Sequence, residues 1–367
     1  MPDEPARGSR ASEPAQPAAT APAQPAAAGR QHRSRVRRPA LVVGLVLVLT
    51  VALVAAAVFF RAPEPRALAL DGDLGTHDPA LVVGGEGQPW FVYSTGDPAR
   101  GLGAPMVHRS ADGLSWERVG PAWPASDDPQ WVRDSIDGVE HYWAPDLIAH
   151  DGTWYLYFSA STFGSNTSAI GLATGASLDP ADPDYGWTHQ GPVWRSQAGE
   201  TNYNAIDPAV VEDDDGHPWL FFGSFWSGIQ VLPLEWPSGM PVEGAEPQLV
   251  ATRTGVSENQ IEAPQVIEHD GWFCLFYIGY EDMFKARICL ARSRDGVTGW
   301  ERHPENPILS PGLPGAWDSE AAYKPFVVYD ADEDQWLMWF NARTSTTERI
   351  GLAVHPGSDL WKERSFG

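Results

Sequence analysis

The sequence predicts an all-β fold, a five-bladed β-propeller, preceded by a disordered N-terminal tail and one transmembrane helix. Two observations predict the propeller. A unit of about 60 residues recurs five times, and each copy consists of short β-runs joined by tight turns, with no long amphipathic helix beyond residue 66. Repeated all-β units of this size are typical of propeller blades. Twenty uncharged, mostly apolar residues before the repeats predict the transmembrane helix.

The segment before the repeats divides into three parts. Residues 1–40 are rich in Pro and Ala, so we expect a disordered tail with a basic end. Residues 41–60 carry no charge and follow a cluster of arginines, which favours a signal-anchor with a cytoplasmic N-terminus. A cleaved signal peptide is the alternative, and residues 61–70 form a linker in both cases. Both interpretations place the domain at 71–367 outside the cytoplasm, either held at the cell membrane or secreted.

Each of the five repeats begins with an apolar run that contains a marker proline. These prolines are 56 to 66 residues apart: Pro79, Pro145, Pro208, Pro264 and Pro325. A tight turn and a tryptophan-led second run follow, which together are a hairpin signal. A third run follows each hairpin, and residues 358–365 are a candidate fourth run in the last repeat. With such a run, the last blade would need no N-terminal strand to complete it.

The tryptophans that lead the second run occupy one position of the repeat. They are Trp90, Trp154, Trp219, Trp272 and Trp336. A bulky apolar position that recurs in every blade is expected to lie in the core between blades. Aromatic residues outside this register are therefore the candidates for contact with a ligand. They are Trp143, Tyr203, Phe225, Trp226, Trp123 and Trp131.

Charge and cysteine content exclude some classes of function. The formal net charge is −23, and most acidic residues lie beyond residue 66. Such a surface repels phosphate backbones, so we expect no nucleic-acid partner. The two cysteines, Cys274 and Cys289, show no metal-ligand spacing. An exported domain permits a disulfide, and the sequence leaves open whether these two side chains face each other.

Charged residues stand beside the marker prolines. They are Asp78, Asp146, Asp207, Glu262 and Lys324. The innermost strands of a propeller line a central channel, so these side chains should converge near one axis. Asp-Pro pairs also start ordinary turns, but three acids at one register of a repeat favour a site. An inverting glycosidase needs such a set: a carboxylate that activates water and a carboxylic acid that protonates the leaving oxygen, about 6.5–9.5 Å apart.

Several motifs resemble those of glycoside hydrolase family 43, in its arabinanase-like branch. They are HDPAL, WAPDL, AIDPAVVEDDDG, FGSFWSGI and IEAPQVI, and the resemblance covers roughly residues 77–300. It implies a five-bladed propeller and an inverting hydrolase of arabinose-containing polysaccharide or oligosaccharide, an endo-1,5-α-L-arabinanase before other activities. An exo-acting α-L-arabinofuranosidase or β-xylosidase of the same family is the first alternative. A retaining fructan-active propeller and a non-catalytic carbohydrate-binding propeller are the others.

The resemblance also implies roles for individual residues. Asp78 matches the general base, Asp207 the acid that modulates the pKa of its partner and orients it, and Glu262 the general acid. Further positions are expected to border the substrate: His77, Trp143, Asp146, Asn204, Ser224, Phe225 and Trp226. The insertions 121–142 and 237–258 are expected to shape the channel mouth, and the shape of the mouth decides between endo and exo action.

The last repeat departs from the family pattern. Arabinanases of this type place a histidine from the final blade near a central calcium or other ion, whereas this chain shows no matching histidine motif and carries Lys324 before the marker proline of its last repeat. No cofactor is expected to be required, and a central calcium site stays open. Lys324 is expected to form either a structural ion pair or a substrate contact. His355 is expected to be a solvated turn residue.

Overall fold

The computed structural model describes residues 70–97, 103–253, 260–280, 285–344, 346–361 and 366. The predicted tail at 1–40, the predicted transmembrane helix at 41–60 and all but the last residue of the linker at 61–70 lie outside these described residues. Within the described part, no helix is long and apolar enough to cross a membrane.

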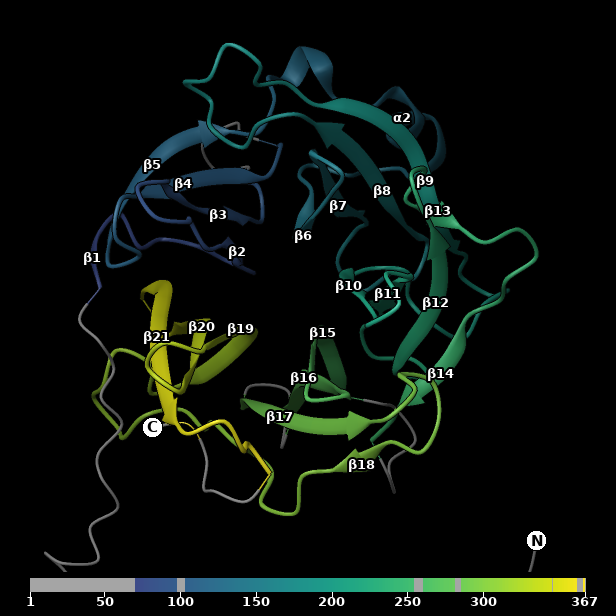
Figure 1. Ribbon diagram of the computed structural model, residues 1–367. Coiled ribbons are helices and arrows are strands. Elements are labelled where there is room, and N and C mark those ends of the chain that lie inside the picture. Colours follow the sequence, from purple (N-terminus) through teal and green to yellow (C-terminus); the bar gives the residue numbers. More distant parts are fainter. Residues whose placement is uncertain are drawn as a thin grey trace, which may run out of the picture. The chain divides into compact units, whose positions relative to one another are not determined.

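Five sheets follow one another along the chain and surround a common centre (Figure 1). Each sheet corresponds to one repeat, so the predicted all-β propeller of five blades is confirmed. Blade I contains β1 (Asp71–Gly72), β2 (Ala80–Val82), β3 (Trp90–Ser94), β4 (Met106–Ser110) and β5 (Ser115–Pro121). Blade II contains β6 (Trp143–His150), β7 (Thr153–Ala160), β8 (Ser168–Gly175) and β9 (Thr188–Ser196).

The remaining blades repeat this antiparallel order. Blade III contains β10 (Ala209–Glu212), β11 (Pro218–Phe222), β12 (Ile229–Glu235), β13 (Met240–Pro241) and β14 (Gln248–Ala251). Blade IV contains β15 (Ile261–His269), β16 (Trp272–Tyr280), β17 (Ala286–Ser293) and β18 (Glu301–Arg302). Blade V contains β19 (Ala321–Asp330), β20 (Gln335–Arg343) and β21 (Glu348–Pro356). Two short helices, η2 (Ala125–Asp127) and α2 (Gln130–Ser135), lie between blades I and II in the sequence.

The core is built where neighbouring blades pack face to face. Each leading tryptophan belongs to one of these apolar clusters or packs against it. Trp336 is completely buried in the cluster that blades IV and V share. The expectation that this repeated position serves packing is therefore confirmed. Alternate residues of a strand enter different clusters, as the two-residue period of a β-strand requires.

The ring closes through the segment that precedes β2. β1 pairs in parallel with β5 on the outer edge of blade I. Further along, the N–H of Ile350 on β21 donates a hydrogen bond to the carbonyl oxygen of Leu74 (2.9 Å). The expected fourth run at 358–365 is wrong for its described part, because 358–361 form a bend and a turn. The segment that precedes β2 instead forms a hydrogen bond to β21, the outer strand of blade V.

The two cysteines do not form a disulfide. They lie on the adjacent strands β16 and β17, but Cys289 is opposite Tyr277 and Cys274 is opposite Arg292. Cys274 enters the cluster shared with blade V, whereas Cys289 packs against the cluster shared with blade III. The two thiols therefore point to opposite faces of blade IV.

The innermost strands share a backbone irregularity at the marker proline. In four blades the residue before that proline has a positive φ: Asp78 (53°), Ala144 (38°), Asp207 (58°) and Ala263 (53°). In β6 and β15 this residue lies in a β-bulge, where the register with the next strand shifts. Aspartate tolerates this left-handed conformation, but for alanine it costs roughly 1–2 kcal/mol. The channel ends of these strands are therefore strained.

We expect Ala144→Gly to stabilise the fold by about 0.5–1 kcal/mol, because glycine adopts a positive φ without a steric penalty. Ala149→Gly is the matched control, since Ala149 lies on the same strand and has no positive φ. This control is expected to destabilise the fold by about 0.5–1 kcal/mol. Denaturant unfolding measures both changes, and a destabilised Ala144→Gly variant would contradict the assignment of strain.

Candidate active site

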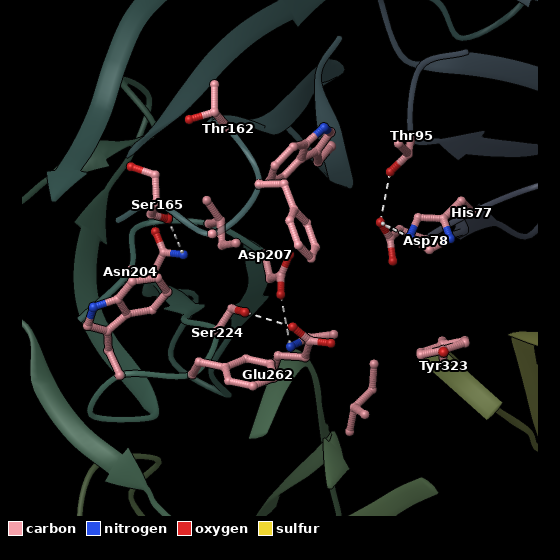
Figure 2. A pocket seen from close by; sticks show the side chains of 18 of the residues that line it. His77, Asp78, Thr95, Thr162, Ser165, Asn204, Asp207, Ser224, Glu262 and Tyr323 are labelled. Carbon is pink, nitrogen blue, oxygen red and sulfur yellow. Dashed lines mark hydrogen bonds and ion pairs between the residues drawn. The ribbon is translucent and has the colours of Figure 1, made fainter. Parts of the chain in front are cut away.

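A cavity of about 860 Å³ is lined by residues from all five blades (Figure 2). All but one of the ten predicted site residues line it. They are His77, Asp78, Trp143, Asn204, Asp207, Ser224, Phe225, Trp226 and Glu262. The repeat explains this convergence, because equivalent strand starts face one axis.

Asp78 precedes β2 and lies on the blade I side of the cavity (Figure 2). Its carboxylate accepts a hydrogen bond from the Thr95 hydroxyl (2.8 Å), and that hydroxyl accepts one from the N–H of Ala144 (2.9 Å). The N–H of Asp78 donates to the amide oxygen of Asn341 (3.3 Å). Blades I, II and V therefore jointly hold the orientation of this carboxylate.

Asp207 and Glu262 lie together across the cavity from Asp78 (Figure 2). The Asp207 carboxylate accepts a hydrogen bond from the N–H of Ala263 (3.1 Å), the residue next to Glu262. The Glu262 carboxylate accepts hydrogen bonds from the hydroxyls of Ser224 (2.7 Å) and Tyr280. The backbone of blade IV thus fixes one acid relative to the other.

Burial raises the pKa of both carboxyl groups in this pair. For Asp207 the nearby charge of Glu262 adds to burial. For Glu262 the hydrogen bonds from Tyr280 and Ser224 work against burial without cancelling it. Two carboxyl groups this close share a site in which ionisation of one opposes ionisation of the other. The pair therefore retains a proton at a higher pH than free carboxyl groups would.

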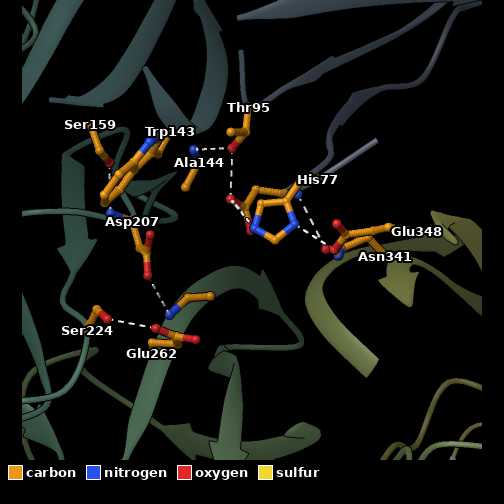
Figure 3. A network of polar contacts seen from close by, with 12 residues as sticks. His77, Thr95, Trp143, Ala144, Ser159, Asp207, Ser224, Glu262, Asn341 and Glu348 are labelled. Carbon is orange, nitrogen blue, oxygen red and sulfur yellow. Dashed lines mark hydrogen bonds and ion pairs between the residues drawn. The ribbon is translucent and has the colours of Figure 1, made fainter. Parts of the chain in front are cut away.

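His77 lies between Asp78 and the last blade, and Figure 3 shows its contact with Glu348. Its Nδ1 lies 2.6 Å from Glu348 Oε1, and its Nε2 lies 3.4 Å from Asp78 Oδ2. Burial disfavours the charged imidazolium, but Asp78 and Glu348 outweigh it and raise the pKa of His77 to about 10. Glu348 also accepts a hydrogen bond from Asn341 (2.8 Å). A cation is therefore held between two carboxylates at neutral pH.

Asp146 is the predicted site residue that does not line the cavity. Its buried carboxylate accepts a hydrogen bond from the N–H of Val210 (2.7 Å) and so links blade II to blade III. Burial raises the pKa of Asp146 to about 6, although the charge of Lys324 opposes the rise. This position does not support the expected contact with substrate.

The last blade also differs from the expectations at His355. His355 is buried and packs against the ring of Phe366 (centroids 5.5 Å apart), so the expectation of a solvated turn residue is wrong. It lies on β21 opposite Trp336, in the apolar packing of the blade. In the described part of the chain, no three His, Cys, Asp or Glu side chains are arranged to hold a metal ion.

The structure adds residues to the cavity wall that sequence reasoning missed. Four belong to one loop: Thr162, Phe163, Gly164 and Ser165. The others are Thr95, His141, Ile206, Ala263, Ile278, Tyr280, Tyr323 and Arg343. The loop follows β7 and contains Phe163, whose side chain is 99% exposed. The signal available in the sequence was that Phe163 is an aromatic residue outside the tryptophan register.

The two insertions expected to shape the mouth lie mainly elsewhere. In 237–258, the described strands β13 and β14 pair with β12 and extend blade III away from its inner strand β10. In 121–142, only His141 lines the cavity, because α2 packs into the core of blades I and II. Three candidate aromatic residues likewise serve packing instead of lining the cavity: Trp123, Trp131 and Tyr203.

The cavity of this five-bladed propeller collects carboxyl groups from several blades, and acid–base hydrolysis of a glycosidic bond uses a pair of such groups. The comparison with known families agrees. The family described as "Glycosyl hydrolases family 43" matches residues 73–357, and the chain belongs to this family.

Two curated relatives illustrate the kinds of protein that this chain resembles. The extracellular exo-α-(1→5)-L-arabinofuranosidase ArbA of Cellvibrio japonicus is 36% identical over 214 residues, 54% of this chain and 57% of that protein. The extracellular endo-α-(1→5)-L-arabinanase 1 of Bacillus subtilis is 36% identical over 230 residues, 61% of this chain and 66% of that protein. The matched part thus spans less than two thirds of the length of either relative.

Solved structures agree on the fold over a longer stretch. An exo-1,5-α-L-arabinanase from a bovine ruminal metagenomic library has a TM-score of 0.64 at 28% identity, covering 80% of this chain and 97% of that one. An α-L-arabinanase of Cellvibrio cellulosa complexed with arabinohexaose has a TM-score of 0.65 at 26% identity, covering 80% and 96%.

Proposed function

We propose that this chain is an inverting glycoside hydrolase that cleaves α-1,5-linked L-arabinose polymers, with Asp78 as general base and Glu262 as general acid. One observation carries the proposal: Asp78 stands on one side of the cavity, and the Asp207–Glu262 pair stands on the other (Figure 2). Inversion requires water and leaving group on opposite faces of the sugar. The named activities of the family relatives supply the substrate class.

The reaction follows from the protonation states. Asp78 accepts a proton from a water molecule as that water attacks the anomeric carbon. Glu262 donates its proton to the glycosidic oxygen as the bond to the anomeric carbon breaks. Burial raises the pKa of Glu262 and the charge of Asp78 adds to the rise, which favours the protonated form that a general acid needs near neutral pH. Asp207 positions Glu262 through the hydrogen bond that its carboxylate accepts from the N–H of Ala263.

We favour endo action, because exposed aromatic side chains extend the cavity wall. Phe163 in the loop after β7 and Trp226 in the loop after β11 are 99% and 36% exposed. Aromatic faces at a cavity rim suit sugar rings that continue beyond the cleaved bond. Exo action is the second candidate, supported by the exo-acting relative in Cellvibrio japonicus.

We also propose that the domain acts outside the cytoplasm. Two curated relatives are named as extracellular proteins. The uncharged stretch at 41–60 has the length of a membrane-spanning helix and follows an arginine cluster. A signal-anchor at this stretch would hold the domain at the cell membrane, and cleavage of the stretch would release it.

The test is product analysis of linear α-1,5-arabinan treated with the purified full-length chain. Proton NMR during the first turnovers is expected to show the β-anomer of arabinofuranose at the new reducing ends, followed by mutarotation. Chromatography is expected to show a ladder of oligosaccharides under endo action, or a single short product under exo action. β-1,4-Xylan is the control polymer. The α-anomer as first product, or release from xylan alone, would contradict the proposal.

A further inference from the structure

Lys324 is a charged side chain for which the proposed mechanism has no step. It lies on β19 in blade V, directly before the marker proline Pro325, and is only 2% exposed. It thus takes the register position that Asp78 and Asp207 take in blades I and III. A buried ammonium group is costly unless oxygen atoms and negative charge surround it.

Backbone carbonyl oxygens of two other blades accept hydrogen bonds from this ammonium group. Lys324 Nζ donates to the carbonyl oxygen of Pro208 (3.4 Å) and to that of Pro264 (3.5 Å). These are the marker prolines of blades III and IV, so the side chain reaches from blade V to the starts of two neighbouring inner strands. Both distances are long for a hydrogen bond. The ammonium group is therefore stabilised by the dipoles of the two carbonyl groups more than by a short hydrogen bond to either of them.

Carboxyl groups of two other blades interact with this charge, Asp146 of blade II and Asp207 of blade III. Asp207 interacts in turn with Glu262 of blade IV. The positive charge of Lys324 lowers the pKa of both Asp146 and Asp207 against the effect of burial. Lys324 therefore offsets part of the negative charge that convergence of the repeats produces.

The resemblance to arabinanases implies a calcium ion at the channel centre, and the residues present do not fit one. Calcium takes six to eight oxygen ligands, and carbonyl and carboxylate oxygens are of the kind it prefers. Here an ammonium group already donates to two such carbonyl oxygens, and a second cation beside it would be repelled. The marker position of the last blade supplies the cation Lys324, not an oxygen ligand for the ion.

We propose that Lys324 is a covalently attached counter-cation that takes the place of a central metal ion, so that the fold and the site work without calcium. Lys324 is a positioning residue: it acts on substrate only through the buried acids. Its effect on the fold stands apart from the proposed activity, whereas its effect on the reaction rests on that activity.

The first test needs no activity. Thermal unfolding of the full-length chain is measured with EDTA and with excess CaCl₂, for the wild type and for Lys324→Ala. The wild type is expected to unfold at the same temperature in both. Lys324→Ala is expected to unfold about 5 °C or more lower in EDTA and to recover part of this loss in CaCl₂, because a cation can then enter the vacated space. A wild type that is stabilised by calcium, or a Lys324→Ala variant that does not respond to it, would overturn the proposal.

The second test separates charge from packing. Lys324→Met keeps the length of the side chain and removes its charge, so it serves if Lys324→Ala does not fold. With arabinan as substrate, the high-pH limb of kcat/KM is expected to move up by about one pH unit or more in Lys324→Met, since the acid pair then holds its proton more tightly. Lys285→Met, an exposed lysine, is the matched control and is expected to leave the limb in place.

The two tests fail in distinguishable ways. An unshifted limb in an active Lys324→Met variant would overturn the role of the lysine charge and leave the hydrolase assignment standing. An inactive wild type would overturn the proposed function, and the unfolding measurements would still decide whether Lys324 replaces a metal ion.

Discussion

Replacing Glu262 by glutamine is expected to lower kcat on arabinan by about 10²–10⁴-fold, the usual contribution of a general acid. The amide cannot donate a proton to the glycosidic oxygen, although it keeps the size of the side chain. It can still bond to the hydroxyls of Ser224 and Tyr280, which hold the carboxyl group in the native chain. We therefore expect the variant to fold and to bind substrate.

The leaving group decides whether this loss reflects acid catalysis. Dinitrophenolate leaves without a proton, so Glu262→Gln is expected to lose far less activity on a dinitrophenyl α-L-arabinofuranoside than on arabinan. Glu268→Gln is the matched control on the same strand, because Glu268 does not line the cavity. Equal losses on both substrates would exclude Glu262 as the proton donor, and so would an undiminished rate on arabinan.

Asp78→Asn is expected to lower kcat by about 10²–10⁴-fold on arabinan and on the aryl substrate alike. Both reactions need an activated water molecule, and the leaving group does not change that need. The Thr95 hydroxyl and the Asn341 amide can hold the variant side chain and backbone as they hold the native ones. Steady-state kinetics on the two substrates therefore separates the base from the acid.

A matched control exists for the backbone at this position. Asp151 also has a positive φ (47°) and lies in an exposed hairpin turn of blade II. Asp151→Asn is expected to leave both rates unchanged, since asparagine tolerates the same conformation. If Asp78→Asn recovered activity on the aryl substrate as Glu262→Gln does, the assignment of Asp78 as base would be wrong.

The fold could be predicted from the sequence because each blade of a propeller repeats the same local sequence pattern. Each blade carries its own proline, turn and leading tryptophan, so five copies of one signal reinforce each other. The same register brought Asp78, Asp207 and Glu262 into one cavity. Trp336 and its equivalents were assigned to packing for the same reason, and the structure places them in the core.

The rest depends on contacts between segments that no repeat relates. Glu348 lies 271 residues from His77 in the sequence, and nothing in the last repeat marks it as a partner. His355 could not be distinguished from a turn residue, because its burial depends on Phe366 beyond the last strand. The cavity contact of Phe163 depends on the length of one loop. Residues 237–258 extend blade III because β13 and β14 pair with β12. Strand pairing of this kind depends on tertiary packing, which the local sequence does not show.

The hydrogen bonds from the last blade to the first have a consequence for biosynthesis. Asp78 emerges early from the ribosome, but Asn341 and Glu348 emerge roughly 10–50 s later at ordinary rates of translation. Until then Asp78, the proposed general base, lacks the neighbours in blade V that help to orient it. A nascent or truncated chain that lacks blade V can thus carry Asp78, Asp207 and Glu262 and still be inactive. Under the proposed function, hydrolytic activity would report that the last blade has folded against the first.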